Sequence, residues 1–203
     1  MTKNVHSVIF LPIKVLLRAT DQTKQSVFEV INRGYDIPRF KYGIILSSRL
    51  KSVNHLFSDL GFDKNEENCF MYLLVKDVDL ALPNFHHSFR KIEEVSTDHL
   101  PVYYSPKFDA IDAPLDISRV LATIAYKPNG NDRYEITAFT SSAKGCGIKL
   151  YNYSILHMQA QTHLSCKRLL AHVVMEHDLV GYYEKKLGFK EIDRFLFKND
   201  EEN

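Results

Sequence analysis

Runs of apolar residues, separated by polar or glycine-containing breaks, predict alternating strands and helices along the chain. The first run, Val8 to Ala19, is rich in valine, isoleucine and leucine and predicts a strand. Thr20 and Asp21 then offer a helix cap with an acid in the first turn, and this helix should run to about Arg33. Residues 32–38, which include a glycine and a proline, predict a loop or helical elbow where that helix stops.

The middle of the chain predicts one helix and two buried strands around a long irregular segment. Ser47 or Ser48 can cap a helix whose apolar residues recur at helical spacing before Gly61 stops it. Residues 69–75 and 120–126 predict buried strands. Between them, residues 79–118 hold four of the seven prolines and predict an insert with little regular structure. Its histidines and aromatic residues either line a pocket or fasten the insert onto the core.

The last third of the chain predicts the order strand, glycine loop, helix, strand, helix and strand. Arg133 to Thr140 is the first of these strands, and a helix is expected from Ile148 onward because apolar residues recur at helical intervals. The later elements are expected at residues 167–175 (strand), 179–186 (helix, stopped by Gly188) and 190–197 (strand).

Composition favours one folded domain. The 203 residues are 45% hydrophobic and 25% charged, which is enough apolar surface for a full core. We therefore expect a single domain over residues 1–198, with the insert at about 79–118 and a frayed acidic tail at 199–203.

Charge, cysteines and hydropathy limit the partners and the compartment. Lys and Arg total 26 against 25 Asp and Glu, so no global field recruits nucleic acid or an acidic membrane. Three cysteines at irregular spacings argue against a disulfide framework and for a reducing compartment. The longest apolar run is too short to span a bilayer, and no cleavage site follows it. A cytoplasmic location is expected, with a nuclear one as the alternative.

The glycine loop at residues 141–147 is the strongest candidate for chemistry. Its glycines permit close backbone approach, and the helix that follows presents unpaired N–H groups with a partial positive charge. Together these make an anion site, although a glycine pair before a helix is also a common tight turn. The spacing matches neither the Walker pattern nor the Rossmann fingerprint. No histidine or cysteine spacing matches a known metal site, so no metal is expected.

Two segments resemble the GNAT acyltransferase superfamily. Residues 142–147, Ser-Ala-Lys-Gly-Cys-Gly, resemble that family's Gln/Arg-x-x-Gly-x-Gly/Ala motif, and residues 183–189 resemble its Tyr-Glu-Lys-Leu-Gly-Phe helix end. Ser142 departs from the usual Gln or Arg, and the second motif has one extra residue before Gly188. The resemblance implies an α/β (α+β) fold with a mixed, mostly antiparallel central sheet flanked by helices on both faces.

The resemblance also implies roles for particular residues. Acetyl-CoA would be the cosubstrate. Tyr183 takes the position of the family's proton-donating tyrosine, with Tyr182 as the alternative, and Glu135 takes that of a carboxylate base acting through water. His172 and His177 are alternative bases. The cofactor-binding positions are Phe139 and Thr140 for the pantetheine and thioester, and Ser142, Lys144, Gly145, Cys146, Gly147 and Ile148 for the pyrophosphate, with Lys149, Lys167 or Arg168 as further sources of positive charge.

These roles describe an N-acetyltransferase that moves acetyl from acetyl-CoA to a primary amine by direct attack in a ternary complex. The acceptor is expected to be a small amine or amino acid, held between residues 32–40, the insert and the central strand. One alternative is a catalytically silent CoA-binding module. Another is a protein lysine or N-terminal acetyltransferase. Cys146 at a helix N-terminus would have a lowered pKa, but no histidine is near it in sequence to support cysteine catalysis. The sequence does not give the oligomeric state.

Overall fold

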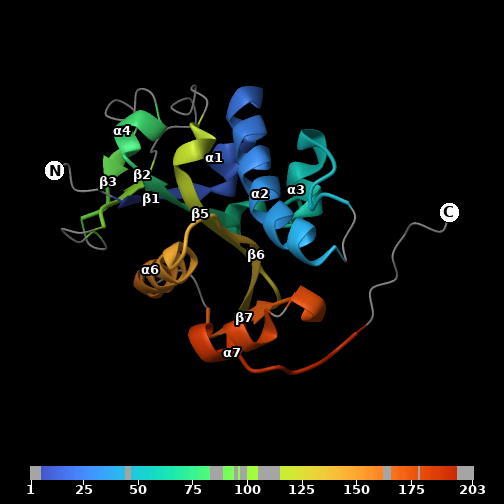
Figure 1. Ribbon diagram of the computed structural model, residues 1–203. Coiled ribbons are helices and arrows are strands. Elements are labelled where there is room, and N and C mark those ends of the chain that lie inside the picture. The colour runs from blue at the N-terminus through green and yellow to red at the C-terminus, as the bar shows by residue number, and fades with distance from the viewer. Residues whose placement is uncertain are drawn as a thin grey trace. The chain divides into compact units, whose positions relative to one another are not determined.

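A mixed sheet organises the computed structural model, which describes residues 6–43, 47–82, 89–93, 96, 100–104, 115–161, 166–177 and 179–195 (Figure 1). The chain divides into two compact units, 1–172 and 173–203.

The sheet of the first unit has seven strands among the described residues, in the order β3-β4-β1-β2-β5-β6-β7. Four of the six neighbouring pairs are antiparallel, and the pairs β1–β4 and β6–β7 are parallel. The strands are β1 (His6–Pro12), β2 (Phe70–Lys76), β3 (Arg90–Lys91), β4 (Val102–Tyr104), β5 (Val120–Pro128), β6 (Arg133–Ser141) and β7 (Arg168–Ala171).

Helices cover both faces of this sheet, as Figure 1 shows. One face carries α1 (Ile13–Leu17), α2 (Asp21–Tyr42) and α3 (Leu56–Asp59), and the other carries α6 (Cys146–Ala160). The short helix α4 (Val78–Ala81) follows β2. Short 3-10 turns lie at Val53–His55, Glu66–Asn68 and Ile117–Arg119. The predicted fold class, a mixed and mostly antiparallel sheet with helices on both faces, is confirmed.

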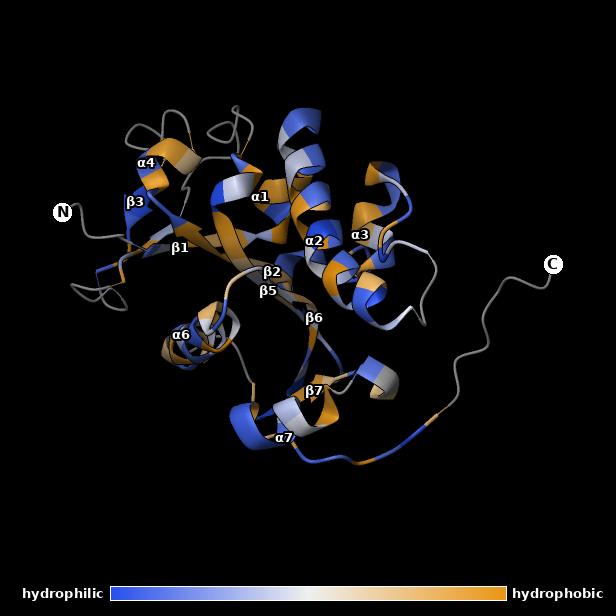
Figure 2. Cartoon of the chain, viewed as in Figure 1, coloured by the Kyte–Doolittle hydropathy of each residue, from blue (hydrophilic) through white to orange (hydrophobic). Residues whose placement is uncertain are grey.

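The two faces are packed differently. Ile9, Leu11, Met71 and Leu73 belong to an aliphatic core that also includes buried side chains of α1, α2 and α3. The face under α6 is aromatic: Phe10, Phe70, Tyr72, Tyr126 and Tyr134 form a cluster of ring contacts. Figure 2 shows hydrophobic residues concentrated on the central strands, where both faces are covered. Alternation along a strand therefore separates an aliphatic from an aromatic core.

The first apolar run folds as two elements, so the prediction of one strand over residues 8–19 was wrong in its second half. β1 ends at Pro12, and α1 begins at Ile13. Proline has no N–H to continue the ladder, and the Ile13 amide turns to the Cys69 carbonyl at 2.9 Å. Val15 and Leu16 are then buried by helical rather than alternating spacing.

The predicted end of the next helix was also wrong. Its cap is confirmed, because the Thr20 hydroxyl accepts from the Thr23 amide at 3.3 Å. However, α2 continues through Gly34 and Pro38 to Tyr42, and Gly43 ends it with φ 67°. Gly34 meets Thr140 of β6 so closely that a larger residue would collide, so this glycine serves packing and not a turn.

Two further predictions need correction. The helix expected after Ser47 or Ser48 begins only at Val53 as a 3-10 turn, and the Ser52 hydroxyl caps it at 3.1 Å from the Asn54 amide. Gly61 stops it as predicted, with φ 73°. The strand expected at 167–175 is shorter, since β7 ends at Ala171.

The second unit contains a 3-10 turn (Met175–His177) and α7 (Val180–Leu187). Gly188 ends α7 with φ 75°, as the sequence predicted. The strand expected at 190–197 was wrong over its described part, because residues 190–195 form no regular element. Ile192 is 79% exposed, so the alternation of apolar and polar residues in this segment does not mark a strand with one buried face. Residues 196–203, which include the predicted acidic tail, lie outside the described residues.

Most of the predicted insert also lies outside the described part of the chain, including Phe85, His86, His87, His99 and Phe108. What is described of it includes β3, β4 and the turn before β5. Phe89, Leu100 and Val102 are buried there. These three apolar side chains fasten the insert to the sheet.

Candidate functional site

The loop between β6 and α6 is shaped by one hydroxyl and one glycine. Ser141 Oγ donates to the Ala143 carbonyl at 2.8 Å and accepts from the Gly147 amide at 3.1 Å. Gly145 stands before the helix with φ 81°, a conformation that side-chain-bearing residues rarely adopt. The predicted helix start at Ile148 was two residues late, because α6 begins at Cys146.

Several amides of this loop are available to a ligand. The Cys146 amide donates to the Ala143 carbonyl at 3.1 Å, and the Gly147 amide is taken by Ser141. Within the described residues, the amides of Lys144, Gly145 and Ile148 have no hydrogen-bond partner. They stand at the N-terminus of a 15-residue helix, whose dipole favours an anion.

Ser142 holds the loop to the sheet. Its hydroxyl lies 3.2 Å from the Leu121 carbonyl and 3.3 Å from that of Val120, and its amide donates to Leu121 at 2.9 Å. Ser142, which stands where the motif it resembles has Gln or Arg, thus anchors the loop to the start of β5. A hydroxyl turned toward carbonyls adds no charge for a phosphate.

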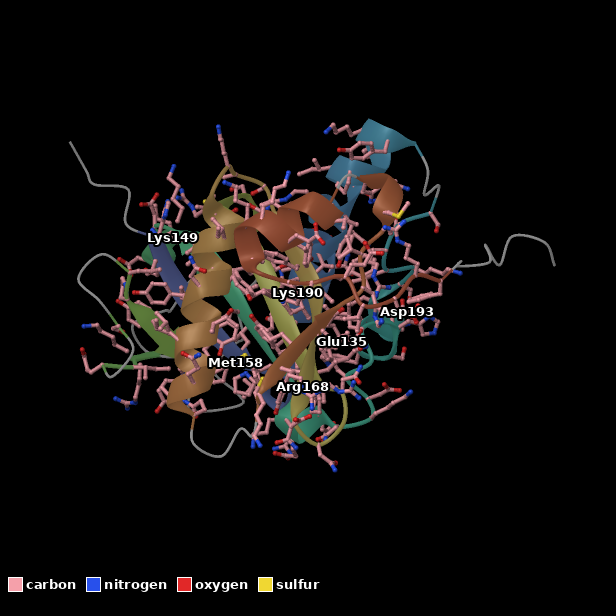
Figure 3. All side chains as sticks on the ribbon, turned by 90° about the horizontal axis from the view of Figure 1, so that it is seen from below. Glu135, Lys149, Met158, Arg168, Lys190 and Asp193 are labelled. Atoms are coloured by element: carbon pink, nitrogen blue, oxygen red, sulfur yellow. The ribbon has the colours of Figure 1, made fainter. Side chains whose placement is uncertain are left out.

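The basic candidates are spread apart. Lys149 Nζ lies 3.3 Å from His6 Nδ1, and Arg168 pairs with Asp132 at 3.0 Å. Figure 3 shows Lys149 and Arg168 far from one another, toward opposite ends of the sheet and helix α6. Lys144 is exposed on the loop itself. Of these side chains, Lys144 is therefore the one best placed to add charge at the loop.

Cys146 does not have the lowered pKa expected of a thiol at a helix N-terminus. The residue is buried, and burial raises the pKa of its thiol despite the nearby charge of Lys149. That expectation was wrong because desolvation exceeds the effect of the helix end. A thiol held neutral is a poor nucleophile.

β6 and β7 pair only over part of β6. The last pair joins Ile136 to Ala171, and β6 continues to Ser141 beyond it. A bulge follows, because Ala125 pairs with Thr137 but Thr123 pairs with Thr140, and Ala138 has φ 47°. The carboxyl ends of two parallel strands therefore separate at a kinked strand, which is where ligands bind in open α/β sheets.

α2 already contacts the two strand positions predicted to hold the pantetheine. The Phe139 backbone hydrogen-bonds the hydroxyl of Tyr35. Burial raises the pKa of Tyr35, and Arg49 and this backbone group offset part of the rise. Thr140 is buried beneath Gly34, and its hydroxyl lies 2.9 Å from that of Thr123. The side chain of Thr140 is therefore occupied in packing.

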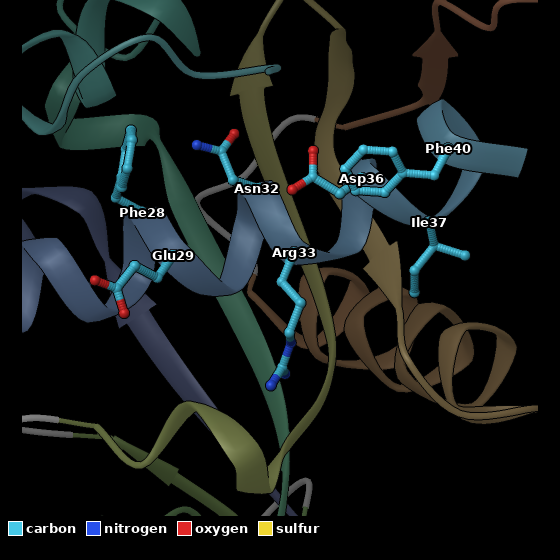
Figure 4. A pocket seen from close by; sticks show the side chains of 7 residues that line it. All are labelled: Phe28, Glu29, Asn32, Arg33, Asp36, Ile37 and Phe40. Atoms are coloured by element: carbon cyan, nitrogen blue, oxygen red, sulfur yellow. The ribbon is translucent and has the colours of Figure 1, made fainter. Parts of the chain in front are cut away.

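Residues of α2 also line a shallow pocket where the acceptor was expected. Its lining is amphipathic, with Phe28, Glu29, Asn32, Arg33, Asp36, Ile37 and Phe40 along one side of the helix (Figure 4). Arg33 reaches the sheet and donates to the Val120 carbonyl at 2.8 Å. Phe40 is 75% exposed at the far end. An apolar ligand with one polar group fits such a lining.

Glu135 lies in a network of donors at the start of β6. Its carboxylate receives Asn129 Nδ2 at 3.0 Å and lies 3.2 Å from Lys127 Nζ and 3.3 Å from His172 Nδ1. Burial raises the pKa of Glu135, but the hydrogen bonds from Asn129 and Lys127 and the charge of Lys127 lower it more, so the net pKa is below its ordinary value. An ionised carboxylate so surrounded is a weak base.

Tyr183 belongs to α7 in the second unit. Its ring lies 5.6 Å from that of Phe189 and 6.1 Å from that of Tyr182, measured between centroids. Burial raises the pKa of Tyr182. His177, the other alternative base in this unit, ends the turn that precedes α7. Adjacent tyrosines on a helix point in different directions, so at most one of them serves as a proton donor at any one site.

The sequence reasoning missed a buried polar network under α6. Tyr72 OH and His157 Nδ1 are 2.7 Å apart, and His157 Nε2 lies 3.0 Å from Gln161 Nε2. Tyr126 OH lies 2.6 Å from Ser154 Oγ. Ser154 and His157 share the helical stripe of the apolar Leu150, a signal that could have placed them in the core.

The described part of the chain offers neither a cluster of metal ligands nor a membrane-spanning helix. There, no group of three or more His, Cys, Asp or Glu side chains is placed to hold a metal ion. Likewise, none of the helices in these segments has the length and hydropathy needed to cross a bilayer.

Comparison with known proteins identifies relatives over the whole chain. Residues 1–203 match the family described as sporulation protein RMD6. The chain is 52% identical over 191 residues to the sporulation protein RMD6 of Saccharomyces cerevisiae, an alignment covering 93% of this chain and 82% of that protein.

Solved structures with a similar fold include two acetyltransferases. A predicted acetyltransferase with acetyl-CoA from Clostridium acetobutylicum has a TM-score of 0.49 and 12% identity, with 96% of each chain covered. A Trypanosoma brucei acetyltransferase has a TM-score of 0.48 and 10% identity, covering 96% of this chain and 99% of that one. The full-length family match and the high identity to the yeast protein show that the chain belongs to the sporulation protein RMD6 family.

Proposed function

We propose that this protein binds acetyl-CoA and transfers the acetyl group to a primary amine, as members of the GNAT superfamily do. The observation that carries the proposal is the loop before α6, where the amides of Lys144, Gly145 and Ile148 are unpaired within the described residues. Lys144 and Gly145 lie within the motif that resembles the family's pyrophosphate loop, and Ile148 directly follows it. A diphosphate supplies enough acceptor oxygens for all three donors.

The kinked end of β6 supports the same proposal. The pantetheine and thioester would run along the edge of β6 beyond its last pair with β7, toward the bulge at Ala138. The Phe139 amide would serve the thioester after release from Tyr35. The acceptor is proposed to be a small amine or amino acid that reaches this edge from the α2 side.

Transfer requires two proton movements. The nitrogen–carbon bond forms as the carbon–sulfur bond breaks, so the amine loses a proton and the departing thiolate gains one. The resemblance assigns the second proton to Tyr183. A phenol has a pKa about 1.5 units above that of an alkyl thiol, so a hydrogen bond that strengthens as charge develops on sulfur is sufficient.

Gly145→Val is expected to weaken CoA binding about tenfold, because a β-branched residue disfavours the left-handed conformation that aims the loop amides. The measurement is isothermal titration calorimetry with CoA. Gly43→Val is the matched control. Gly43 also has positive φ and open space around it, but it lies at the end of α2 and not in the loop before α6. Equal losses for both variants would contradict a binding role for the loop.

Tyr183→Phe is expected to lower the rate of CoA release with an accepted amine at least tenfold while CoA binding is retained, because the proton for the thiolate is lost. Thiol release is followed with a chromogenic disulfide across a panel of amines. Tyr182→Phe, the neighbouring change on the same helix, serves as the control and should leave the rate within about twofold of wild type. A reversed pattern would move the role to Tyr182.

A second candidate function is a silent CoA-binding module. It is favoured by Tyr35, whose hydroxyl already engages the Phe139 backbone at the place proposed for the thioester. A module of this kind would bind CoA and release no thiol with any amine. CoA binding without thiol release for any amine of the panel would support the silent module.

A further inference from the structure

We propose that His172, oriented by Glu135, is the base that takes the proton from the attacking amine. This inference rests on the proposed acetyl transfer and assigns its first proton movement. The sequence resemblance gives the base to Glu135 itself, so the two assignments compete. The contacts around the two side chains favour the imidazole.

Glu135 is poorly suited to receive a proton from a substrate. Its side chain is 13% exposed and is surrounded by three donors, Lys127, Asn129 and His172. Lys127 is its direct cross-strand partner on β5, so the positive charge beside Glu135 is fixed by strand register. To act as base, the carboxylate would have to give up these hydrogen bonds at the moment of reaction, which carries a free-energy penalty.

His172 is accessible where Glu135 is not. Its side chain is 48% exposed, while its Nδ1 lies 3.3 Å from Glu135 Oε1. A carboxylate at Nδ1 holds the ring proton on that nitrogen, and the lone pair is then on Nε2. Glu135 thereby sets both the tautomer and the orientation of the imidazole, which makes it a positioning residue.

The backbone places this pair at the proposed reaction site. His172 directly follows Ala171, the last residue of β7 to pair with β6. It therefore stands where the two strands separate, one residue from the level of the Ala138 bulge, or roughly 3 Å along the strand direction. An imidazole side chain spans much of that distance.

The pair also faces the side from which the acceptor is proposed to enter. Tyr134 points to the aromatic cluster under α6, so its neighbour Glu135 points to the opposite face. That face carries α2, whose Gly34 contacts Thr140 farther along β6. A base on the α2 side is on the same side of the sheet as the pocket lined by α2.

The proton balance is simple. The amine nitrogen bonds to the thioester carbon, its proton passes to Nε2 of His172, and the carbon–sulfur bond breaks to leave a thiolate. The thiolate is protonated by the phenol or by water, and the imidazolium returns its proton to solvent. No oxidant or other reactant is needed.

The test compares His172→Ala, Glu135→Gln and the control His55→Ala in the full-length protein. His55 is an exposed histidine of the Val53–His55 turn. We expect His172→Ala to lower kcat about 100-fold while CoA binding is retained. Glu135→Gln should lower kcat about tenfold and keep KM within about twofold. His55→Ala should match wild type.

Nitrogen NMR of the resting protein gives a readout that does not depend on turnover. In wild type the His172 ring should carry its proton on Nδ1, and Glu135→Gln should shift the population toward the Nε2-protonated tautomer. A wild-type ring protonated on Nε2 would overturn the proposal. Thermal unfolding and CoA titration of each variant show that fold and donor binding persist.

The outcomes separate the two proposals. If His172→Ala keeps wild-type turnover and Glu135→Gln loses it, Glu135 is the base and only this inference fails. If wild type binds CoA but acetylates no amine, the proposed acetyl transfer fails and the base assignment fails with it. A 100-fold loss with His172→Ala, a smaller loss with Glu135→Gln and no loss with His55→Ala supports both.

Discussion

Gly34→Ala is expected to destabilise the first unit by about 3 kcal/mol, which corresponds to a fall in the unfolding midpoint of about 6 to 12 °C. A methyl group on Gly34 would lie 2.5 Å from Thr140 Oγ1 and 2.7 Å from Thr140 Cγ2, and closer still to Thr140 Cβ. These atoms are close to the backbone of β6 and cannot swing away. Thr140 is also fixed by its hydroxyl contact with Thr123 at 2.9 Å.

The same change should also disturb the proposed site, because relief of the collision moves α2 away from the end of β6. Differential scanning calorimetry measures the stability loss, and CoA titration measures the effect on the site. Gly181→Ala is the control: Gly181 also lies within a helix but has open space around it, so alanine there should leave the first unit unchanged. An unchanged midpoint for Gly34→Ala would refute the close packing of α2 on β6.

Acidification below about pH 6.5 is expected to weaken the fold by as much as about 3 kcal/mol through one residue, His157. The side chain is 2% exposed beneath α6, and burial lowers its pKa to about 4. Above the ordinary histidine pKa of 6.5, the ring is neutral in the folded and unfolded chains, so stability is full. Between pH 6.5 and 4 only the unfolded chain takes up the proton, and stability falls by about 1.4 kcal/mol per pH unit.

Below pH 4 both states are protonated at this site and its contribution levels off. Denaturant unfolding at a series of pH values measures the slope. His157→Gln removes the titrating group, so its stability should change much less between pH 6.5 and 5 even though the variant is weaker at neutral pH. His6 has a pKa lowered by burial and by Lys149, and its smaller slope in the same direction remains in the variant. Equal slopes for both proteins would contradict the neutral buried histidine.

Strand positions and the glycine loop could be predicted from local pattern. β2, β5 and β6 are continuous apolar or alternating runs bounded by turn residues, and they form where expected. The loop before α6 followed from two glycines ahead of a helical repeat. In each case the residues that decide the structure are neighbours in sequence.

Helix ends and side-chain partners could not be predicted in the same way. Gly34 and Pro38 are ordinary stop signals, yet α2 passes both. Gly34 lies where the helix packs on β6 and Thr140 leaves no room for a side chain. The partners of Glu135 come from β5 and from the residue after β7, which pair with β6 only in the folded sheet. Their effect on the carboxylate pKa is therefore invisible in the sequence.

The sequence alone determined the main strands and the loop that can bind an anion, because apolar periodicity and glycine conformational freedom act over a few residues, and its resemblance to a known family implied the fold class. Only the tertiary structure decided which loop amides are already paired, which face of β6 each side chain occupies and that His172 contacts Glu135. These depend on strand register and on packing between segments distant in the chain, where one residue of shift changes every contact.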